Sequence, residues 1–400
     1  MSQDPAPTQG LLRFTRLPMA ENRTDAYRIV RDAGPITKTH RGYLLSSSEY
    51  VEYALKHPEL FSSQRAFDMV GSPLPMVPIA FDPPEHTRYR HILQPFVGPR
   101  EVAGWQPRVR SLVGTLIDSV VDRGHCDLVA DLAVPLPAEV FLTLFGLPLA
   151  DRDRLIAWKE GLLASPMVGA SQPTEDIIRA GTELFTYLVG HVSERRKHPS
   201  GADDLLGRLL ADTTEDRLSD DELLGLSFLF VLAGLDTVTS ALSTAFAALA
   251  AQPRLRQQLA ADPSVIPDAV EELLRIDGPV PYLPRVASRD VEMGGHTIPA
   301  GAEVAVAIAV ANRDPSEHPD PDEINLRRQE RHHAFGGGPH RCLGSHLARM
   351  EMREVLTEWH RRIPEYELAP GFAPRVEWPQ GLVGLDTLPL VFPPGAAAAA

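Results

Sequence analysis

The sequence predicts a mainly α-helical protein with small β-sheets. Most of the chain between Gly42 and Gln258 places apolar residues at three- and four-residue spacing, which is typical of helices that bury one face. Candidate strands are few and short, at 36–47, 291–310 and 388–392. They do not alternate regularly with helices, so the pattern does not favour a parallel βαβ sheet.

Bulk composition indicates one large folded unit. The chain has 400 residues, 44% of them hydrophobic, and no clear linker divides it, so we expect a single domain over 1–395 and a tail at 396–400. A net charge of −14 argues against nucleic-acid binding. Two cysteines, Cys126 and Cys342, make no disulfide framework, and the N-terminus has no signal-peptide pattern. We therefore expect a cytoplasmic protein.

The segment 223–252 is apolar and carries one charge, Asp236. About 20 apolar residues suffice to cross a bilayer. However, a charged residue near the middle of such a span costs about 2.5–3.5 kcal/mol, and Thr237, Thr239 and Ser240 crowd the same half. We therefore expect a long central helix of a soluble protein rather than a membrane span.

The stretch "AFGGGPHRCLG", 334–344, sets one cysteine among glycines and basic residues. Its spacing fails the G-x-G-x-x-G dinucleotide pattern at Arg341, and His340 with Cys342 supplies only two of the ligands that a structural zinc site needs. A buried structural cysteine explains neither the glycines nor the charges. A single thiolate does suffice as an axial ligand to haem iron, and glycines let a planar macrocycle lie close to the backbone.

This stretch resembles the haem-binding loop of the cytochromes P-450, F-G-x-G-x-[HR]-x-C-x-G. Three other stretches are similar to family motifs and follow in the same order: "DPPEHTRYR" at 82–90, "AGLDT" at 233–237 and "EELLR", which contains an E-x-x-R pair. The resemblance covers essentially the whole chain except the tail. It implies the P-450 fold, with haem b between a long central helix and the cysteine loop.

The resemblance also implies roles for individual residues. Cys342 would ligate the iron, and haem contacts would come from these residues of the loop, the central helix and the propionate-binding positions: Phe335, Gly336, Gly344, Ala233, His86, Arg90, Arg285 and His340. We expect the two arginines to matter more than the two histidines, because a histidine is charged only when protonated.

Asp236 and Thr237 match the acid–alcohol pair of the family's oxygen-binding helix. The resemblance implies that they deliver protons during oxygen activation. From the residues alone, an ionisable side chain inside an apolar helix is costly unless it has a role, and Gly234 weakens the helix nearby.

Glu272 and Arg275 match the family's structural E-x-x-R pair. The third partner is expected to be an arginine before the cysteine loop, with Arg328 favoured over Arg327. The usual aromatic–Asp lead-in is replaced at 324–325 by Ile and Asn, which leaves the identity of this partner open.

The resemblance places a substrate pocket under the apolar stretch 66–81. We expect its wall to include residues from that stretch, the central helix and later loops: Met76, Phe230, Ala233, Val280, Leu283 and Val383. The implied substrate is an apolar organic molecule of small to medium size.

The implied reaction is monooxygenation: O₂ is activated with electrons from NAD(P)H through a ferredoxin reductase and a ferredoxin. Arg349 and Arg353 share one helical face after the cysteine and are candidates for docking an acidic donor. A monomer is expected, with no nucleic-acid or membrane partner. Two alternatives stay open: a peroxygenase driven by H₂O₂ on the same fold, and a haem-binding sensor or carrier without catalysis.

Overall fold

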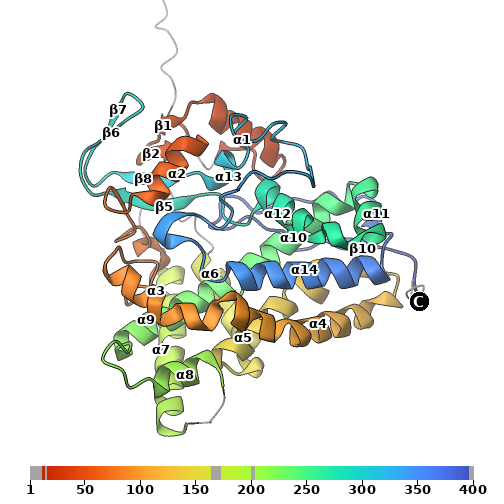
Figure 1. Cartoon of the computed structure of the whole chain (residues 1–400), viewed down its shortest axis with the longest axis horizontal. Coiled ribbons are helices and arrows are strands. Elements are labelled where there is room, and N and C mark those ends of the chain that lie inside the picture. Colours follow the sequence, from red (N-terminus) through yellow and green to blue (C-terminus); the bar gives the residue numbers. More distant parts are fainter. Residues whose placement is uncertain (1–10, 14–15, 164–172, 200–202, 396–400) are drawn as a thin grey trace, which may run out of the picture.

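A computed structural model describes residues 11–13, 16–163, 173–199 and 203–395, so the expected tail at 396–400 lies outside the described residues. Helices make up most of the molecule, and a five-stranded sheet lies at one end (Figure 1). The helices are α1 (Arg23–Asp32), α2 (Ser48–Lys56), α3 (Glu85–Val97), α4 (Pro99–Val121), α5 (Pro135–Phe145), α6 (Arg152–Leu163), α7 (Glu175–Lys197), α8 (Leu205–Ala211), α9 (Asp220–Gly234), α10 (Thr237–Ala250), α11 (Pro253–Ala261), α12 (Ile266–Asp277), α13 (Ile308–Ala311) and α14 (Ser345–Arg362).

The strands build three small sheets in the described part of the chain. Their order is β1-β2-β8-β5-β3 in the largest, β4-β10-β9 in the second and β6-β7 in the third. The strands are β1 (Ile36–Lys38), β2 (Gly42–Leu45), β3 (Phe61–Ser62), β4 (His125–Asp127), β5 (Leu283–Ala287), β6 (Val291–Met293), β7 (His296–Ile298), β8 (Glu303–Val306), β9 (Glu367–Leu368) and β10 (Pro389–Val391).

Strands β2 and β8 pair in parallel, and β5 joins β8 antiparallel. Their pairing needs glycine at position 42, because a Cβ there would lie 1.9 Å from the carbonyl oxygen of Glu303. Strand β5 of this sheet carries Arg285, whose side chain is buried. This sheet therefore positions one of the residues expected to bind the cofactor.

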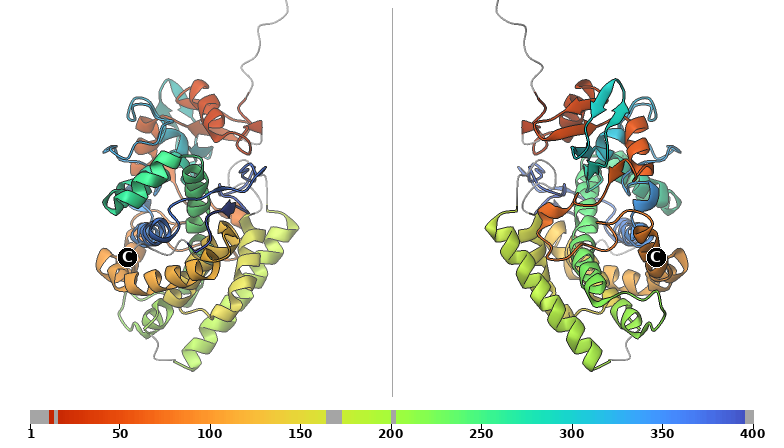
Figure 2. Two further views of the ribbon diagram at one scale, coloured as in Figure 1. Left: turned by 90° about the vertical axis from the view of Figure 1, so that its right-hand side faces the viewer. Right: turned by 90° about the vertical axis from the view of Figure 1, so that its left-hand side faces the viewer.

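Helices α9 and α10 cross the middle of the molecule end to end (Figure 2). Helix α9 begins with a capping box between Ser219 and Glu222, which satisfies backbone N–H groups that would otherwise lack partners. Asp220–Ala250 is the stretch of the described chain that is long and apolar enough to cross a membrane, and 61% of its most apolar window is buried inside the protein. It is a core helix in this structure.

Helix α14 begins just after Cys342 and lies along α4 (Figure 1). Glu354 of α14 accepts hydrogen bonds from Gln106 and Arg110 of α4, at 2.6 and 2.8 Å. At its far end Trp359 is fully buried and packs edge-to-face on Phe246 of α10, with ring centroids 5.2 Å apart. These contacts fix α14, the helix that follows the cysteine loop, against α4 and the central helix α10.

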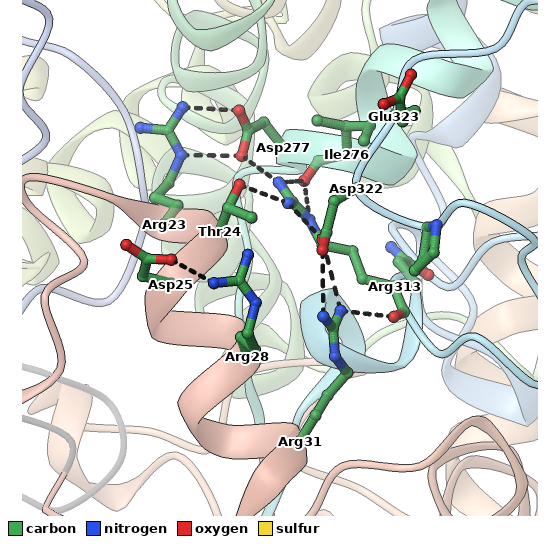
Figure 3. A network of polar contacts seen from close by, with 12 residues as sticks. Arg23, Thr24, Asp25, Arg28, Arg31, Ile276, Asp277, Arg313, Asp322 and Glu323 are labelled. Carbon is green, nitrogen blue, oxygen red and sulfur yellow. Dashed lines mark hydrogen bonds and ion pairs between the residues drawn. The ribbon is translucent and has the colours of Figure 1, made fainter.

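A buried polar network joins the N-terminal helix to the segment before the cysteine loop (Figure 3). Arg23 of α1 forms two hydrogen bonds with Asp277, at 2.8 and 2.7 Å. Arg313, which is 2% exposed, contacts Asp277 and Asp322 at 3.3 and 3.1 Å. Arg31 reaches Asp322 at 3.2 Å. Each buried arginine here faces at least one carboxylate.

The predicted strand regions 36–47, 291–310 and 388–392 all contain strands. The sequence reading missed β3, β4, β5 and β9, and it assigned no helix to the segment of α1. Most of these strands have two or three residues, which is too short for an alternating pattern to be recognised. They form because a partner strand is supplied from far along the chain, as β10 supplies one for β4.

Candidate functional site

The loop that carries Cys342 is fixed by its backbone. The Cys342 N–H donates to the Phe335 carbonyl at 2.9 Å, which closes the loop on itself. Gly336 and Gly338 have φ of +65° and +60°, and a Cβ at Gly338 would lie 1.9 Å from the Leu55 carbonyl oxygen. Only glycine fits these positions without strain. The loop is thereby pressed against the end of α2.

Cys342 lies among many protein atoms, and yet it keeps solvent-accessible area, so a space opens beside it. Burial raises the pKa of its thiol. A hydrogen bond from the Gly344 backbone and the positive charges of Arg90 and Arg349 act in the opposite direction. These groups favour a thiolate, as a metal ligand requires.

Four basic side chains from three segments converge near this loop. His86 and Arg90 lie on α3, Arg285 on β5, and His340 within the loop. The rings of His86 and His340 are 4.1 Å apart, and Arg90 Nη1 donates to the carbonyl of Arg341 at 2.8 Å. The structure therefore brings together all four residues that the sequence assigned to propionate binding.

Among the described residues, no carboxylate lies within ion-pair distance of the two arginines of this cluster. Arg285 is 4% exposed, and no carboxylate of the described residues forms an ion pair with Arg285 or Arg90. Asp82 is the nearby acid, and its Oδ1 lies 3.9 Å from Nε2 of His340. A buried, unpaired guanidinium is unfavourable, so the cluster is suited to an anionic ligand group.

The two histidines are held neutral. Burial lowers the pKa of His86 to about 4, and the charge of Arg90 adds to the effect. Burial and the charge of Arg285 lower the pKa of His340 to about 2. The positive charge of the cluster at neutral pH therefore comes from the arginines.

The central helix is interrupted where the acid–alcohol pair lies. Regular helix ends at Gly234 and resumes at Thr237, and Asp236 between them has φ −133° and ψ −32°. The Thr237 hydroxyl donates to the Ala233 carbonyl at 3.1 Å. A Cβ at Gly234 would lie 2.4 Å from the ring of Phe141, so close packing fixes the break. Ala233 is exposed although it lies in the middle of this helix.

Asp236 does not stand alone. Lys159 of α6, which is 5% exposed, donates from Nζ to Asp236 Oδ1 at 2.9 Å. The sequence analysis missed Lys159. A signal was present: this lysine shares one helical face with Leu155 and Leu162, both buried, where a charged side chain requires a partner. The identity of that partner depends on tertiary packing.

Glu272 and Arg275 are both buried and form two hydrogen bonds, at 2.7 and 2.8 Å. Arg328 Nε lies 3.1 Å from Glu272 Oε1, while Arg327 is exposed. Asn325, at the position that departs from the family pattern, donates its backbone N–H to Glu272 at 2.8 Å. The structure thus places Arg328 where the third partner was expected.

The expected pocket residues differ in exposure. Phe230, Val280 and Leu283 are half-buried, and Ala233 is exposed, so their surfaces face open space. Met76 and Val383 are 3% and 1% exposed and pack into the hydrophobic core. These two residues are therefore core residues in this structure and expose no surface to a pocket.

The two candidate docking arginines on α14 also differ. Arg349 pairs with Glu271 at 2.7 Å, and its side chain is 15% exposed. Its guanidinium lies over the Phe335 ring, 4.2 Å from the centroid. Arg353 is exposed and forms no ion pair with any described residue. Of the two, only Arg353 presents a free charge to solvent.

Comparisons with known proteins identify the family of this chain. A family model described as Cytochrome P450 matches residues 169–362. The vitamin D(3) 25-hydroxylase of Pseudonocardia autotrophica is 34% identical over 394 residues, which cover 94% of this chain and 95% of that protein. A probable cytochrome P450 127A1 of Sinorhizobium fredii is 34% identical over 362 residues, covering 87% and 85%. The chain belongs to the cytochrome P450 family.

Solved structures lead to the same conclusion. The myxobacterial cytochrome P450 CYP267B1, solved with myristic acid, has a TM-score of 0.84 at 32% identity over 95% of this chain and 98% of that chain. CxnD, a cytochrome P450 for C–S bond formation in chuangxinmycin biosynthesis, has a TM-score of 0.86 at 29% identity over 95% and 97%. The predicted fold class is confirmed.

This cytochrome P450 is a monooxygenase, and its cofactor is haem b. Its residues fit that group. A cysteine with accessible area can supply the thiolate, and buried arginines without acidic partners can receive carboxylates such as the propionates.

Proposed function

We propose that this cytochrome P450 activates O₂ with electrons from a ferredoxin and hydroxylates a small-to-medium apolar organic molecule in the cytoplasm. Cys342 is the proposed axial ligand. The observation that carries the proposal is the link between the two halves of the site: Arg90, in the unpaired basic cluster, donates to the carbonyl directly before Cys342. The relatives' names include a hydroxylase and a hydroxylase/epoxidase, which supports this chemistry.

When bound, a thiolate-ligated haem supplies the chemistry of O–O cleavage and oxygen transfer. The chain's own residues would hold it: Cys342 at the iron, Arg90 and Arg285 at the propionates, with His86 and His340 packed between them. Phe335, Gly336, Gly344 and Ala233 are proposed to line the remaining faces. The burial of Arg285 and His86 keeps water away from that side of the cluster, which strengthens the charge interactions of Arg285.

Thr237 and Asp236 are the proposed proton-handling residues. The Thr237 hydroxyl currently donates to the Ala233 carbonyl, so it has to rotate to donate elsewhere. Asp236 is fixed by Lys159 from another helix. To relay a proton, the Asp236 carboxylate must exchange this ion pair for a proton donor from solvent. Lys159 would therefore control when Asp236 can act.

The proposed substrate is apolar because the residues expected to form the pocket wall that keep accessible surface are Phe230, Ala233, Val280 and Leu283. Apolar walls bind a ligand mainly through the hydrophobic effect. Arg353 and Arg341, both exposed and close to Cys342 in sequence, are the proposed contacts for an acidic ferredoxin. We propose a monomeric enzyme with an electron donor of opposite charge at this surface.

A direct test uses purified, haem-loaded protein. We expect the reduced carbon monoxide complex to show the red-shifted band of thiolate ligation, and Cys342→Ser to lose it. A panel of apolar compounds should contain one that displaces the sixth ligand and shifts the Soret band. Product formation should require O₂ with ferredoxin, reductase and NAD(P)H. Equal turnover with H₂O₂ alone would favour a peroxygenase, and spectral binding without any product would favour a sensor.

A further inference from the structure

Glu271 of α12 links that helix to the cysteine loop. It directly precedes Glu272 of the E-x-x-R pair, but its carboxylate faces different partners. Arg349 of α14 donates to both of its oxygens, from Nε and Nη2, at 2.7 Å each. His332 lies just before the loop, and its Nε2 is 3.1 Å from Oε2 of Glu271. One carboxylate thus joins α12, α14 and the chain that enters the loop.

The contact of His332 has a defined direction. Its Nδ1 accepts a hydrogen bond from the backbone N–H of Ala334 at 3.1 Å, so Nδ1 carries no proton. We therefore assign the proton to Nε2, which donates it to Glu271. The His332 side chain is 7% exposed, so this bridge is shielded from water. It fixes the backbone one residue before Phe335.

Arg349 completes the link. Its guanidinium lies between the Glu271 carboxylate and the face of the Phe335 ring, 4.2 Å from the ring centroid. The Phe335 carbonyl in turn accepts the backbone N–H of Cys342 at 2.9 Å. A continuous series of contacts therefore runs from Glu271 through Arg349 and Phe335 to Cys342.

We propose that Glu271, acting through Arg349 and His332, is a positioning residue that sets the geometry of the cysteine loop and thereby the electronic environment of the iron ligand. The proposal rests on the proposed function, because that function assigns Cys342 to the iron. Backbone N–H groups near a ligating sulfur withdraw electron density from it, and their aim depends on how rigidly the loop is held. The Arg349 guanidinium contacts both the Glu271 carboxylate and the Phe335 ring, so it is suited to holding the loop rigidly. An arginine that docks a partner protein instead needs N–H donors that are free.

The test compares the haem-loaded wild type with Glu271→Gln, Arg349→Gln and the double variant. We expect each single variant to shift the haem reduction potential to more negative values and to speed the transfer of haem to an acceptor protein about tenfold, the effect of about 1.4 kcal/mol of lost contact. The double variant should add little to either single variant, because the two residues act as one unit. Arg349→Lys, which keeps the charge but not the planar fork, should be intermediate.

Glu358→Gln is the matched control. Glu358 pairs with Arg361 at 2.7 Å on the same helix, well away from the loop in sequence, so its removal should leave the potential and the rate of haem transfer unchanged. Thermal unfolding of each variant separates stability from positioning. Variants of Glu271 and Arg349 that unfold earlier, yet keep the wild-type potential and haem-transfer rate, would overturn the proposal.

A second contrary result is possible. If Arg349→Gln altered only the salt dependence of reduction by ferredoxin, while Glu271→Gln had no effect, Arg349 would be a docking residue and the proposal would fail. Failure of the proposed function looks different: the wild type itself would then lack the spectrum of a thiolate-ligated haem.

Discussion

Two clusters of arginine, each built around one buried arginine (Arg313 and Arg285), differ in charge balance. In the network of Figure 3, Arg23, Arg31 and Arg313 face the carboxylates of Asp277 and Asp322. Beside the cysteine loop, the described carboxylates leave Arg90 and Arg285 without an ion pair. Because an unpaired buried charge is costly, the first cluster is complete as folded and the second requires a ligand. Charge balance thus distinguishes a structural network from a binding site.

The largest effect is expected in the balanced network. Replacing Arg313 with Met leaves Asp277 and Asp322 with fewer partners inside the protein, so Arg313→Met should lower the free energy of unfolding by about 3–5 kcal/mol. Arg28→Met is the control, since Arg28 pairs with Asp25 at an exposed position and should cost less than about 1 kcal/mol. Denaturant titration of the haem-loaded protein measures both. Equal costs would remove the distinction between buried and exposed pairs.

The next prediction concerns how the free energy of unfolding depends on pH, which should differ between the cluster beside the cysteine loop and the network of Figure 3. His86 has a folded pKa of about 4 against an ordinary 6.5, so the unfolded chain binds more protons between these values. Stability is therefore full above about pH 6.5 and falls as pH approaches 4, by up to about 3 kcal/mol. The carboxylate of Asp277, whose pKa Arg23 and Arg313 hold below its ordinary 3.8 despite burial, loses stability only at still lower pH.

Denaturation of the haem-free protein at a series of pH values tests this difference. His86→Gln should reduce the slope between pH 6.5 and 4 by the contribution of one histidine, while the other buried histidines with a lowered pKa, His318, His340 and His360, keep the remainder. A wild-type slope near zero in that interval would contradict a neutral, buried His86.

A smaller effect is expected for Arg285. Arg285→Met removes a charge-assisted contact worth about 1.5–3 kcal/mol, so haem should dissociate at least about tenfold more readily. The haem-free protein should not be destabilised, because no carboxylate partner is left behind. Haem titration and unfolding of the haem-free protein measure the two effects, and Arg285→Lys should restore part of the affinity. A large loss of stability without loss of haem affinity would show that Arg285 stabilises the fold and does not bind the haem.

The smallest effect on stability is expected at Lys159. Lys159→Met frees Asp236, which is partly exposed and can be hydrated, so the cost should be about 1 kcal/mol. The share of consumed O₂ that appears as product should nevertheless fall, because Asp236 loses its fixed position. Parallel measurement of O₂ uptake and product formation tests this. Unchanged coupling would exclude a role for the pair in proton delivery.

The sequence was sufficient for features whose partners lie close together in the chain. The glycines before Cys342 were expected to let a planar macrocycle lie close to the backbone; the structure gives two of them positive φ and places Gly338 against the Leu55 carbonyl. Arg328 lies 56 positions from Glu272 and is an exception: the family resemblance favoured it over Arg327, and the structure brings it to Glu272. Helices were recognisable where the apolar period was long.

Contacts between distant segments were not predictable in the same way. Lys159 with Asp236 and Glu271 with Arg349 are separated by 77 and 78 positions, and only packing decides which charges meet. Arg349 was expected to dock a partner because it shares a helical face with Arg353. The structure turns Arg349 inward onto Phe335, since the one-dimensional pattern does not reveal that Glu271 lies across from it.

Arg275 binds the segment before the cysteine loop through backbone carbonyl oxygens, which do not depend on the identity of the side chain. It donates to the carbonyls of Asn312, Pro321 and Glu323 at 2.8–2.9 Å. Side chains along this irregular stretch can therefore be exchanged in evolution while its path is retained. The unusual Ile and Asn at 324–325 illustrate such freedom, because the Asn325 contact to Glu272 uses the backbone N–H. Sequence drift here need not disturb the haem site that follows.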